Sequence, residues 1–315
     1  MTPPIPRPGP GGAFIMNEPM ENHSKWAGVD PATMTLAHTL TGRPGGKVVL
    51  FIHGITGSRN YFLKKARPLA ENYNLLLPDL PGFGDSPKPR TDYNIQLFRD
   101  TVRNTVVAAG CHHRKIHIVG HSLGALIALE YAAKYPDHVD RLALVSLPRF
   151  HDPEVAHEYF WQGSPSYRRL LNEHSLRRNL AQWRRSGLSM AVQYMFRFPL
   201  SVIRDSRKYT LNSLTSTLEH CLLNYRVDEV FSRQPHIPIL MLHGRLDQVA
   251  PLENVRDLPD RHDNIRLVEI DGSGHHIFLT HTRRCLELIS THLAGEPAPA
   301  PAVPAPDSDI LSDPA

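Results

Sequence analysis

Cysteine is scarce in this sequence, and the few cysteines lie far apart. Only Cys111, Cys221 and Cys285 occur among 315 residues. An odd number of widely spaced cysteines does not form the paired framework of a small disulfide-rich domain. It also provides no cysteine cluster for a structural zinc ion. A hydrophobic core must therefore stabilise the fold, and the length is sufficient for one large domain or two small ones.

Long apolar runs and a strong excess of charge are also missing. No run of 18 apolar residues occurs, so no membrane-spanning helix is expected. Residues 1–12 lack a charged region followed by an apolar stretch, which argues against a secretory signal and leaves a cytoplasmic location as the default. The net charge of +4 is too small to indicate nucleic-acid binding over the whole surface.

Two tails differ in composition from the body of the chain. Residues 1–25 are rich in proline and glycine, and residues 295–315 are rich in proline and alanine. Neither shows the periodicity of a helix or strand, so both are predicted to be disordered. The body at 26–294 is predicted to form the folded domain.

Apolar runs alternate with helical patterns in that body. Runs typical of buried parallel strands span 48–53, 75–77, 116–119, 142–147, 237–242 and 265–270. Helical periodicity occurs at 95–109, 123–135 and 286–293. This alternation predicts the α/β class, with a doubly wound, mostly parallel sheet. Functional residues of such sheets lie at the carboxyl ends of the strands.

A long interval at about 148–236 has little strand pattern and several helical signals. Ser175 is a candidate helix N-cap, and apolar residues recur at helical spacing from Leu211 to Tyr225. We expect a helical lid inserted after a sheet strand. Residues 160–210 contain nine arginines, one lysine and two acidic residues, a local charge of +8. This charge indicates either a solvated helix face or attraction of an anionic substrate carrier or a lipid surface.

The segment Gly120-His-Ser-Leu-Gly124 matches the pattern G-x-S-x-G and lies between a predicted strand and a predicted helix. That context is the one the pattern requires, because the glycines permit a sharp turn that presents the serine hydroxyl at the end of the sheet. Ser122 is therefore the candidate nucleophile. The helix N-terminus that follows it favours negative charge.

A serine hydroxyl needs a base, and the base needs a group that orients it. His275 follows the last predicted strand after a glycine-rich loop and is the candidate base, with the adjacent His276 as the competitor. Asp247 follows the preceding strand and is the candidate acid that orients the histidine. Asp271, in the histidine's own loop, is the weaker alternative.

A developing oxyanion requires two N–H donors. The backbone amide of Leu123, directly after the nucleophile, is one candidate. The backbone amide of Ile55, in the loop after the strand at 48–53, is the other. His53 and Gly54 shape that loop, and His53 is interpreted as a structural histidine.

These motifs resemble, in order and spacing, those of the α/β-hydrolase superfamily. They are HG at 53–54 with GS at 57–58, PDLPGFGDS at 78–86, GHSLG at 120–124, HGRLD at 243–247 and GSGHH at 272–276. The resemblance covers about residues 33–293. The branches of lipid esterases and carbon–carbon bond hydrolases look nearest, and branches with an aspartate nucleophile are disfavoured because position 122 is serine.

The resemblance implies hydrolysis of an ester or thioester with a small to medium acyl group through an acyl-enzyme on Ser122, His275 and Asp247. Alternatives are a carbon–carbon bond hydrolase, or a cofactor-free haloperoxidase or lyase, using the same triad. A non-catalytic ligand-binding protein with this fold is a further alternative. No cofactor and no metal are expected, because none of the histidine clusters matches a zinc-hydrolase pattern.

Overall fold

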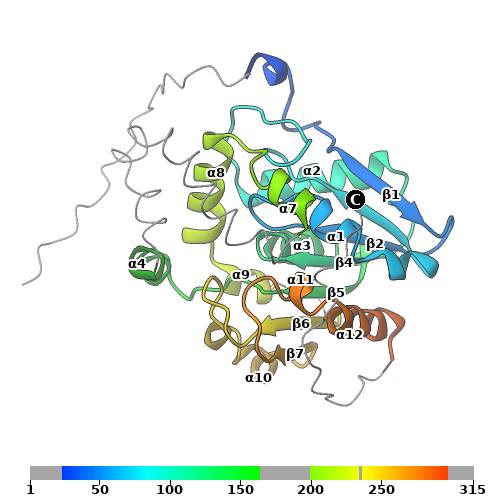
Figure 1. Cartoon of the computed structure of the whole chain (residues 1–315), viewed down its shortest axis with the longest axis vertical. Coiled ribbons are helices and arrows are strands. Elements are labelled where there is room, and N and C mark those ends of the chain that lie inside the picture. Colours follow the sequence, from blue (N-terminus) through cyan, green and yellow to red (C-terminus); the bar gives the residue numbers. More distant parts are fainter. Residues whose placement is uncertain (1–22, 164–198, 234–235, 297–315) are drawn as a thin grey trace, which may run out of the picture.

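The computed structural model describes residues 23–163, 199–233 and 236–296 (Figure 1). Seven strands of this described part form one sheet in the order β1-β3-β2-β4-β5-β6-β7. The strands are β1 His38–Gly42, β2 Val48–Ile52, β3 Asn74–Pro78, β4 Ile116–His121, β5 Val139–Val145, β6 Ile239–Gly244 and β7 Ile265–Ile270. β1 pairs antiparallel with β3, and the remaining neighbours are parallel. In Figure 1, β1 and β7 lie at opposite edges of the sheet.

Helices connect the strands of the sheet. The α-helices outside the β5–β6 interval are α1 Asn60–Leu63, α2 Ile95–Ala108, α3 Leu123–Lys134, α10 Leu258–Arg261, α11 Ile277–Thr280 and α12 Thr282–Ala294. Short 3₁₀ turns are η1 His23–Trp26, η2 Arg67–Glu71, η3 Pro136–His138 and η5 Leu252–Asn254. The side chain of Asn94 caps α2 by accepting a hydrogen bond from the amide of Leu97, which satisfies one N–H of the first turn.

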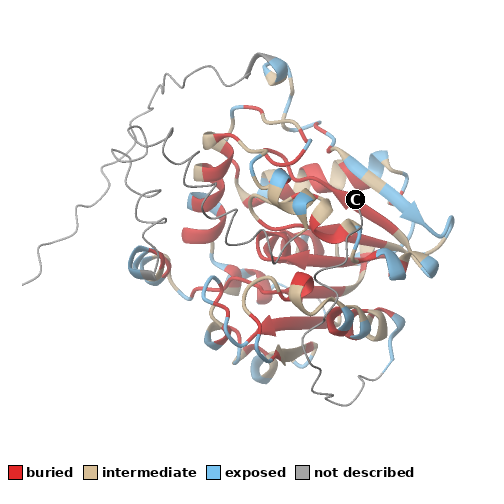
Figure 2. Ribbon diagram, viewed as in Figure 1, coloured by how far each residue is buried: buried red, intermediate tan, exposed pale blue. Residues whose placement is uncertain are grey.

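The side chains of β2 show that the sheet is buried on both faces. Leu50 and Ile52 pack in the cluster that includes α2 and α3. Val49 and Phe51, which point to the opposite face, pack in the cluster that includes α1, α11 and α12. Figure 2 accordingly shows the central strands as buried and β1 as largely exposed. This arrangement explains why the central strands have continuous apolar sequences.

The predicted fold class is confirmed, and each predicted strand is present. β5 begins at Val139, three residues before the predicted start, because the half-buried Asp140 and Arg141 interrupt the apolar run. β1 was not predicted, because its sequence HTLTG has a single large apolar residue and the strand is an exposed edge. The helix predicted at 286–293 begins earlier, at Thr282.

Between β5 and β6 the described residues form helices. These are α4 Pro153–Gly163, α7 Leu200–Asp205, α8 Leu211–Thr217, the π-helical turn η4 Leu218–Leu223 and α9 Val227–Phe231. The helical pattern predicted from Leu211 onward is therefore confirmed by α8 and η4. The candidate cap Ser175 and seven of the nine arginines lie outside the described residues, and the function of this interval as a lid stays a prediction.

Candidate active site

The parallel strands β4, β5, β6 and β7 place their carboxyl ends at one edge of the sheet. Ser122 comes directly after β4, at the N-cap of α3, with φ +53° and ψ −118°. Its amide donates to the carbonyl of Val145, the last residue of β5, at 2.9 Å. A serine with positive φ is strained, and such strain is typical of functional sites. The strand, the strained turn and the helix are the arrangement that the G-x-S-x-G pattern predicts.

The two glycines of the motif are required by close backbone approach. A Cβ on Gly120 would overlap the carbonyl of Gly124, the second residue of α3. A Cβ on Gly124 would overlap the carbonyl of Ile52 at the end of β2. Any larger residue at either position would therefore push the turn at Ser122 away from the sheet.

Asp247 and His275 are paired, as the sequence predicts. The Nδ1 atom of His275 lies 2.9 Å from Oδ2 and 3.1 Å from Oδ1 of Asp247. The amides of Val249 and Ala250 also donate to Oδ1 of Asp247, both at 2.9 Å. Burial alone would raise the pKa of Asp247, but the hydrogen bonds from His275 and the two amides outweigh burial and lower it. Asp247 is therefore an ionised acceptor.

This pairing determines which nitrogen of His275 can act as a base. An ionised carboxylate only accepts hydrogen bonds, so in neutral His275 the proton is on Nδ1. The Nε2 atom then carries the lone pair that can take a proton from a hydroxyl group. The ring of His275 lies 5.0 Å, centroid to centroid, from that of His121, the residue before Ser122.

The two alternative residues have other surroundings. The Nδ1 atom of His276 lies 3.5 Å from the hydroxyl of Tyr61, and burial lowers the pKa of His276 to about 3. Asp271 is exposed and forms an ion pair with Arg245 at 2.9 Å. Of the two histidine and two aspartate candidates, the hydrogen-bonded pair is His275 with Asp247.

The loop after β2 lies directly against the turn at Ser122. A Cβ on Gly54 would lie 3.2 Å from the Cβ of Ser122, so the backbone next to Ile55 is close to the serine. The Nδ1–H of His53 donates to the carbonyl of Gly54 at 2.7 Å, and Nε2 accepts from the amide of Leu80 at 2.8 Å. Burial lowers the pKa of His53 and keeps it neutral. This is the structural role that the sequence indicates for His53.

Leu123 is the first residue of α3, where helix amides have no intrahelical acceptor. The structure thus places both candidate amides, those of Leu123 and Ile55, near Ser122. Their function as an oxyanion hole stays a proposal.

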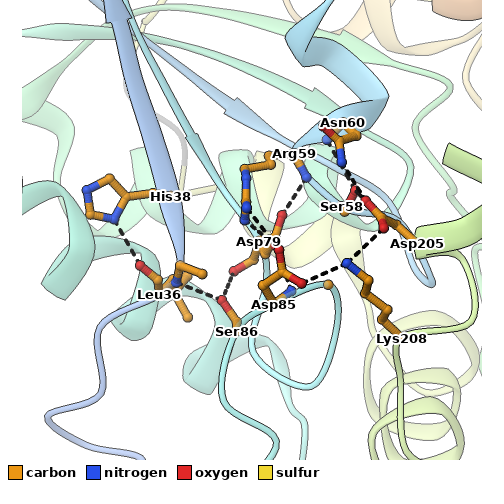
Figure 3. A network of polar contacts seen from close by, with 12 residues as sticks. Leu36, His38, Ser58, Arg59, Asn60, Asp79, Asp85, Ser86, Asp205 and Lys208 are labelled. Atoms are coloured by element: carbon orange, nitrogen blue, oxygen red, sulfur yellow. Dashed lines mark hydrogen bonds and ion pairs between the residues drawn. The ribbon is translucent and has the colours of Figure 1, made fainter. Parts of the chain in front are cut away.

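A polar network holds the other end of the loop that carries Ile55 (Figure 3). The amide and the guanidinium of Arg59 both donate to the buried carboxylate of Asp79, each at 2.6 Å. The same guanidinium contacts Asp85 at 2.9 Å, and the amide of Asp85 donates to Asp79 at 2.7 Å. The network therefore joins this loop to the segment that follows β3.

Asp205, the last residue of α7, extends this network. Its buried carboxylate accepts hydrogen bonds from Ser58 at 2.9 Å, Asn60 at 2.5 Å and Lys208 at 2.9 Å (Figure 3). Burial alone would raise the pKa of Asp205, but these three donors outweigh it and lower the pKa to about 2. The sequence does not indicate this role for Asp205, because its partners Ser58 and Asn60 lie about 145 positions away.

Neither a metal-binding cluster nor a membrane-spanning helix occurs among the described residues. Among residues 23–163, 199–233 and 236–296, no three histidine, cysteine, aspartate or glutamate side chains are grouped so that they could hold a metal ion. In the same part of the chain, no helix combines the length and the apolar character needed to cross a bilayer.

Comparison with known proteins identifies a family. Residues 47–282 match the family model described as the alpha/beta hydrolase fold. A stretch of 116 residues is 39% identical to Lipase 1 of Psychrobacter immobilis and spans 36% of each chain. The chain thus matches about a third of the length of this curated relative.

Solved structures show the same fold over most of the chain. An esterase from Exiguobacterium antarcticum has a TM-score of 0.65 at 17% identity and covers 82% of this chain and 95% of its own. A putative lipase from Acinetobacter baumannii has a TM-score of 0.63 at 23% identity and covers 90% of this chain and 98% of its own. At these identities the likeness establishes the fold.

Proposed function

The chain belongs to the alpha/beta hydrolase fold family, and on that premise we propose that it is a serine hydrolase acting on esters or thioesters of small to medium acyl groups. The observation that carries the proposal is the hydrogen-bonded pair of His275 with the buried Asp247, next to the strained turn at Ser122. The names of the relatives, lipases and esterases, support cleavage of an ester bond.

The proposed reaction follows from this geometry. The hydroxyl of Ser122 attacks the carbonyl carbon of the substrate, while Nε2 of His275 takes the hydroxyl proton. Asp247 stabilises the resulting imidazolium and keeps the ring oriented. The amides of Leu123 and Ile55 donate to the oxyanion. His275 then gives its proton to the leaving group, and water cleaves the acyl-enzyme by the same route.

The proposal is tested by turnover of p-nitrophenyl esters from acetate to dodecanoate. Wild type, Ser122→Ala and the control Ser232→Ala are compared, since Ser232 is an exposed serine at the end of α9. We expect turnover by wild type and by the control, and loss of turnover in Ser122→Ala. The acyl length with the highest kcat/KM indicates how long an acyl chain the pocket accepts.

Other outcomes point to the alternatives. If wild type is as inactive as Ser122→Ala, ester hydrolysis is wrong, and cleavage of a carbon–carbon bond or ligand binding without turnover takes its place. If Ser122→Ala keeps the wild-type rate, Ser122 is not the nucleophile. The cytoplasmic location stays a prediction.

The basic interval at 160–210 bears on the leaving group. Of its ten basic residues, Arg204, Arg207 and Lys208 are described, and Lys208 is paired with Asp85 and Asp205. Attraction of an acyl thioester carrier or a lipid surface therefore stays a prediction. If this prediction is right, kcat/KM for the anionic acyl-CoA falls with added salt, because salt screens the attraction. The kcat/KM for a neutral ester should not fall.

A further inference from the structure

Two neighbouring strands end in the same unusual way. β4 is followed by Ser122 and β5 by Ser146, and both serines have φ +53°. The amide of Ser146 donates to the carbonyl of Leu242 in β6 at 2.8 Å, as the amide of Ser122 does to the carbonyl of Val145. Positive φ is unfavourable for serine and persists where the surroundings impose it. The strain at Ser122 belongs to the nucleophile turn, but the strain at Ser146 has no part in the reaction described so far.

The side chain of Ser146 is directed at the main chain of the candidate base. Its Oγ–H donates to the carbonyl oxygen of His275 at 2.9 Å, and Ser146 is fully buried. The Nε2–H of His121 donates to the same oxygen at 3.0 Å. A carbonyl oxygen has two lone pairs, so these two donors satisfy it completely.

The protonation of His121 follows from this contact. A carbonyl only accepts, so His121 carries its proton on Nε2, and Nδ1 is left as a buried acceptor with no hydrogen-bond partner in the described part of the chain. Burial and the neighbouring His275 and His276 lower the pKa of His121 well below its ordinary value, which keeps the ring neutral. An apolar ring would fill this space without an unsatisfied nitrogen. What the histidine adds is the Nε2–H donor.

The loop that carries His275 needs such support. Gly272, with φ +65°, and Gly274 leave room for a Cβ, so no side chain at these two positions restrains the chain before His275. The hydrogen bond to Asp247 restrains the imidazole at Nδ1 only. The ring can still pivot about that atom. Fixing the carbonyl of the same residue restrains the backbone from which the ring projects.

We propose that Ser146 and His121 are positioning residues that hold the main chain of His275 and thereby direct its Nε2 toward Ser122. The inference rests on the proposed function, in which His275 is the base. A base must keep its geometry within a fraction of an ångström, and a displacement of about 1 Å can cost about 100-fold in rate.

The experiment compares variants that lack one of the two hydrogen-bond donors to the carbonyl of His275 with control variants that keep both donors. Ser146→Ala removes the hydroxyl and keeps the strained backbone, whereas Ser146→Gly removes the hydroxyl and relieves the strain. The matched control is Ser273→Ala, a buried serine in the loop of His275 whose hydroxyl contacts Thr280 instead. We expect kcat for a p-nitrophenyl ester to fall at least about tenfold in both Ser146 variants, with KM changed less than about twofold.

A second pair of variants tests His121. His121→Phe keeps a ring to stack on Tyr61, whose centroid lies 4.4 Å from that of His121, but it has no donor. His121→Gln loses the ring and keeps an N–H donor of similar reach. If positioning through the donor matters, kcat is higher in His121→Gln than in His121→Phe. The reverse order would show that the ring acts only as packing.

Hydrogen exchange separates this inference from the proposed function. Exchange of the main-chain amides at residues 271–279 is followed by mass spectrometry in wild type and in each variant. The proposal requires faster exchange in Ser146→Gly and His121→Phe than in Ser273→Ala. Equal exchange, or kcat within twofold of the Ser273→Ala value, overturns the positioning role while esterase activity stands. If wild type hydrolyses no ester but exchange is still faster in Ser146→Gly and His121→Phe, the proposed function is overturned. The anchoring of this loop is then still supported.

Discussion

Replacing Asp205 by asparagine should cost stability in a way that depends on pH. The buried carboxylate at the end of α7 accepts from Ser58, Asn60 and Lys208, and these donors lower its pKa from 3.8 to about 2. A pKa difference of one unit corresponds to about 1.4 kcal/mol, so the ionised form contributes about 2 kcal/mol to the free energy of unfolding. Asparagine keeps the shape of the side chain but has no charge.

The sign follows from the direction of the shift. A carboxyl group whose pKa is lower in the folded state stabilises the fold when it is ionised in both states, which is the case above about pH 5. As the pH falls through 3.8 toward about 2, the unfolded state takes up its proton first, and the stabilisation is lost. The difference between wild type and Asp205→Asn should therefore be constant from pH 7 to about pH 5 and shrink below that.

Urea unfolding, followed by tryptophan fluorescence at several pH values, measures this difference. The control is Asp137→Asn, an exposed aspartate in η3, which should behave like wild type throughout. Equal stability of Asp205→Asn and wild type at pH 7 would refute the reasoning. A difference that stays constant down to pH 3 would show that the loss arises from packing and not from ionisation.

Three further variants test other parts of the structure. Asp247→Asn should lower kcat for a p-nitrophenyl ester by about 10⁴-fold with a small change in KM, because the histidine loses its orienting acceptor. Gly124→Ala should lower kcat at least about 100-fold, because the new methyl group overlaps the carbonyl of Ile52. The control Gly28→Ala, at a position with open space around it, should keep the wild-type kcat. Phe62→Ala should lower the free energy of unfolding by about 3–5 kcal/mol in urea, since the ring is fully buried.

The parts of the fold that the sequence predicts are those with a local signal. A central strand such as β4 is buried on both faces and has a continuous apolar sequence. The turn at Ser122 lies between Gly120 and Gly124, and backbone contacts leave no room for a Cβ at either glycine. The Asp247–His275 pair follows from chain order, because the two residues lie in the loops after the neighbouring parallel strands β6 and β7.

The parts that were not predicted depend on contacts between distant segments. β1 becomes a strand by pairing with β3, and its own sequence carries little apolar pattern. Ser146 and His275 are 129 positions apart, and Ser58 and Asp205 are 147 positions apart. One general rule could have indicated Ser146, because it is a polar residue at the carboxyl end of an apolar strand, the edge where functional residues gather.

The contacts around the site divide it into two halves, and mutations in one half should have effects independent of mutations in the other. Ser146 and His121 donate hydrogen bonds to the main chain of His275, whereas Asp205 accepts from Ser58 and Asn60, where the loop with the candidate oxyanion amide meets α1. Within the described part of the chain, the two sets share no hydrogen-bond partner. Effects of mutations without shared partners add to within about 0.5 kcal/mol. The combined variant Ser146→Gly with Asp205→Asn should therefore show a loss of log kcat equal to the sum of the single losses. A combined loss that departs from this sum by more than about threefold in rate would show that the two halves move together.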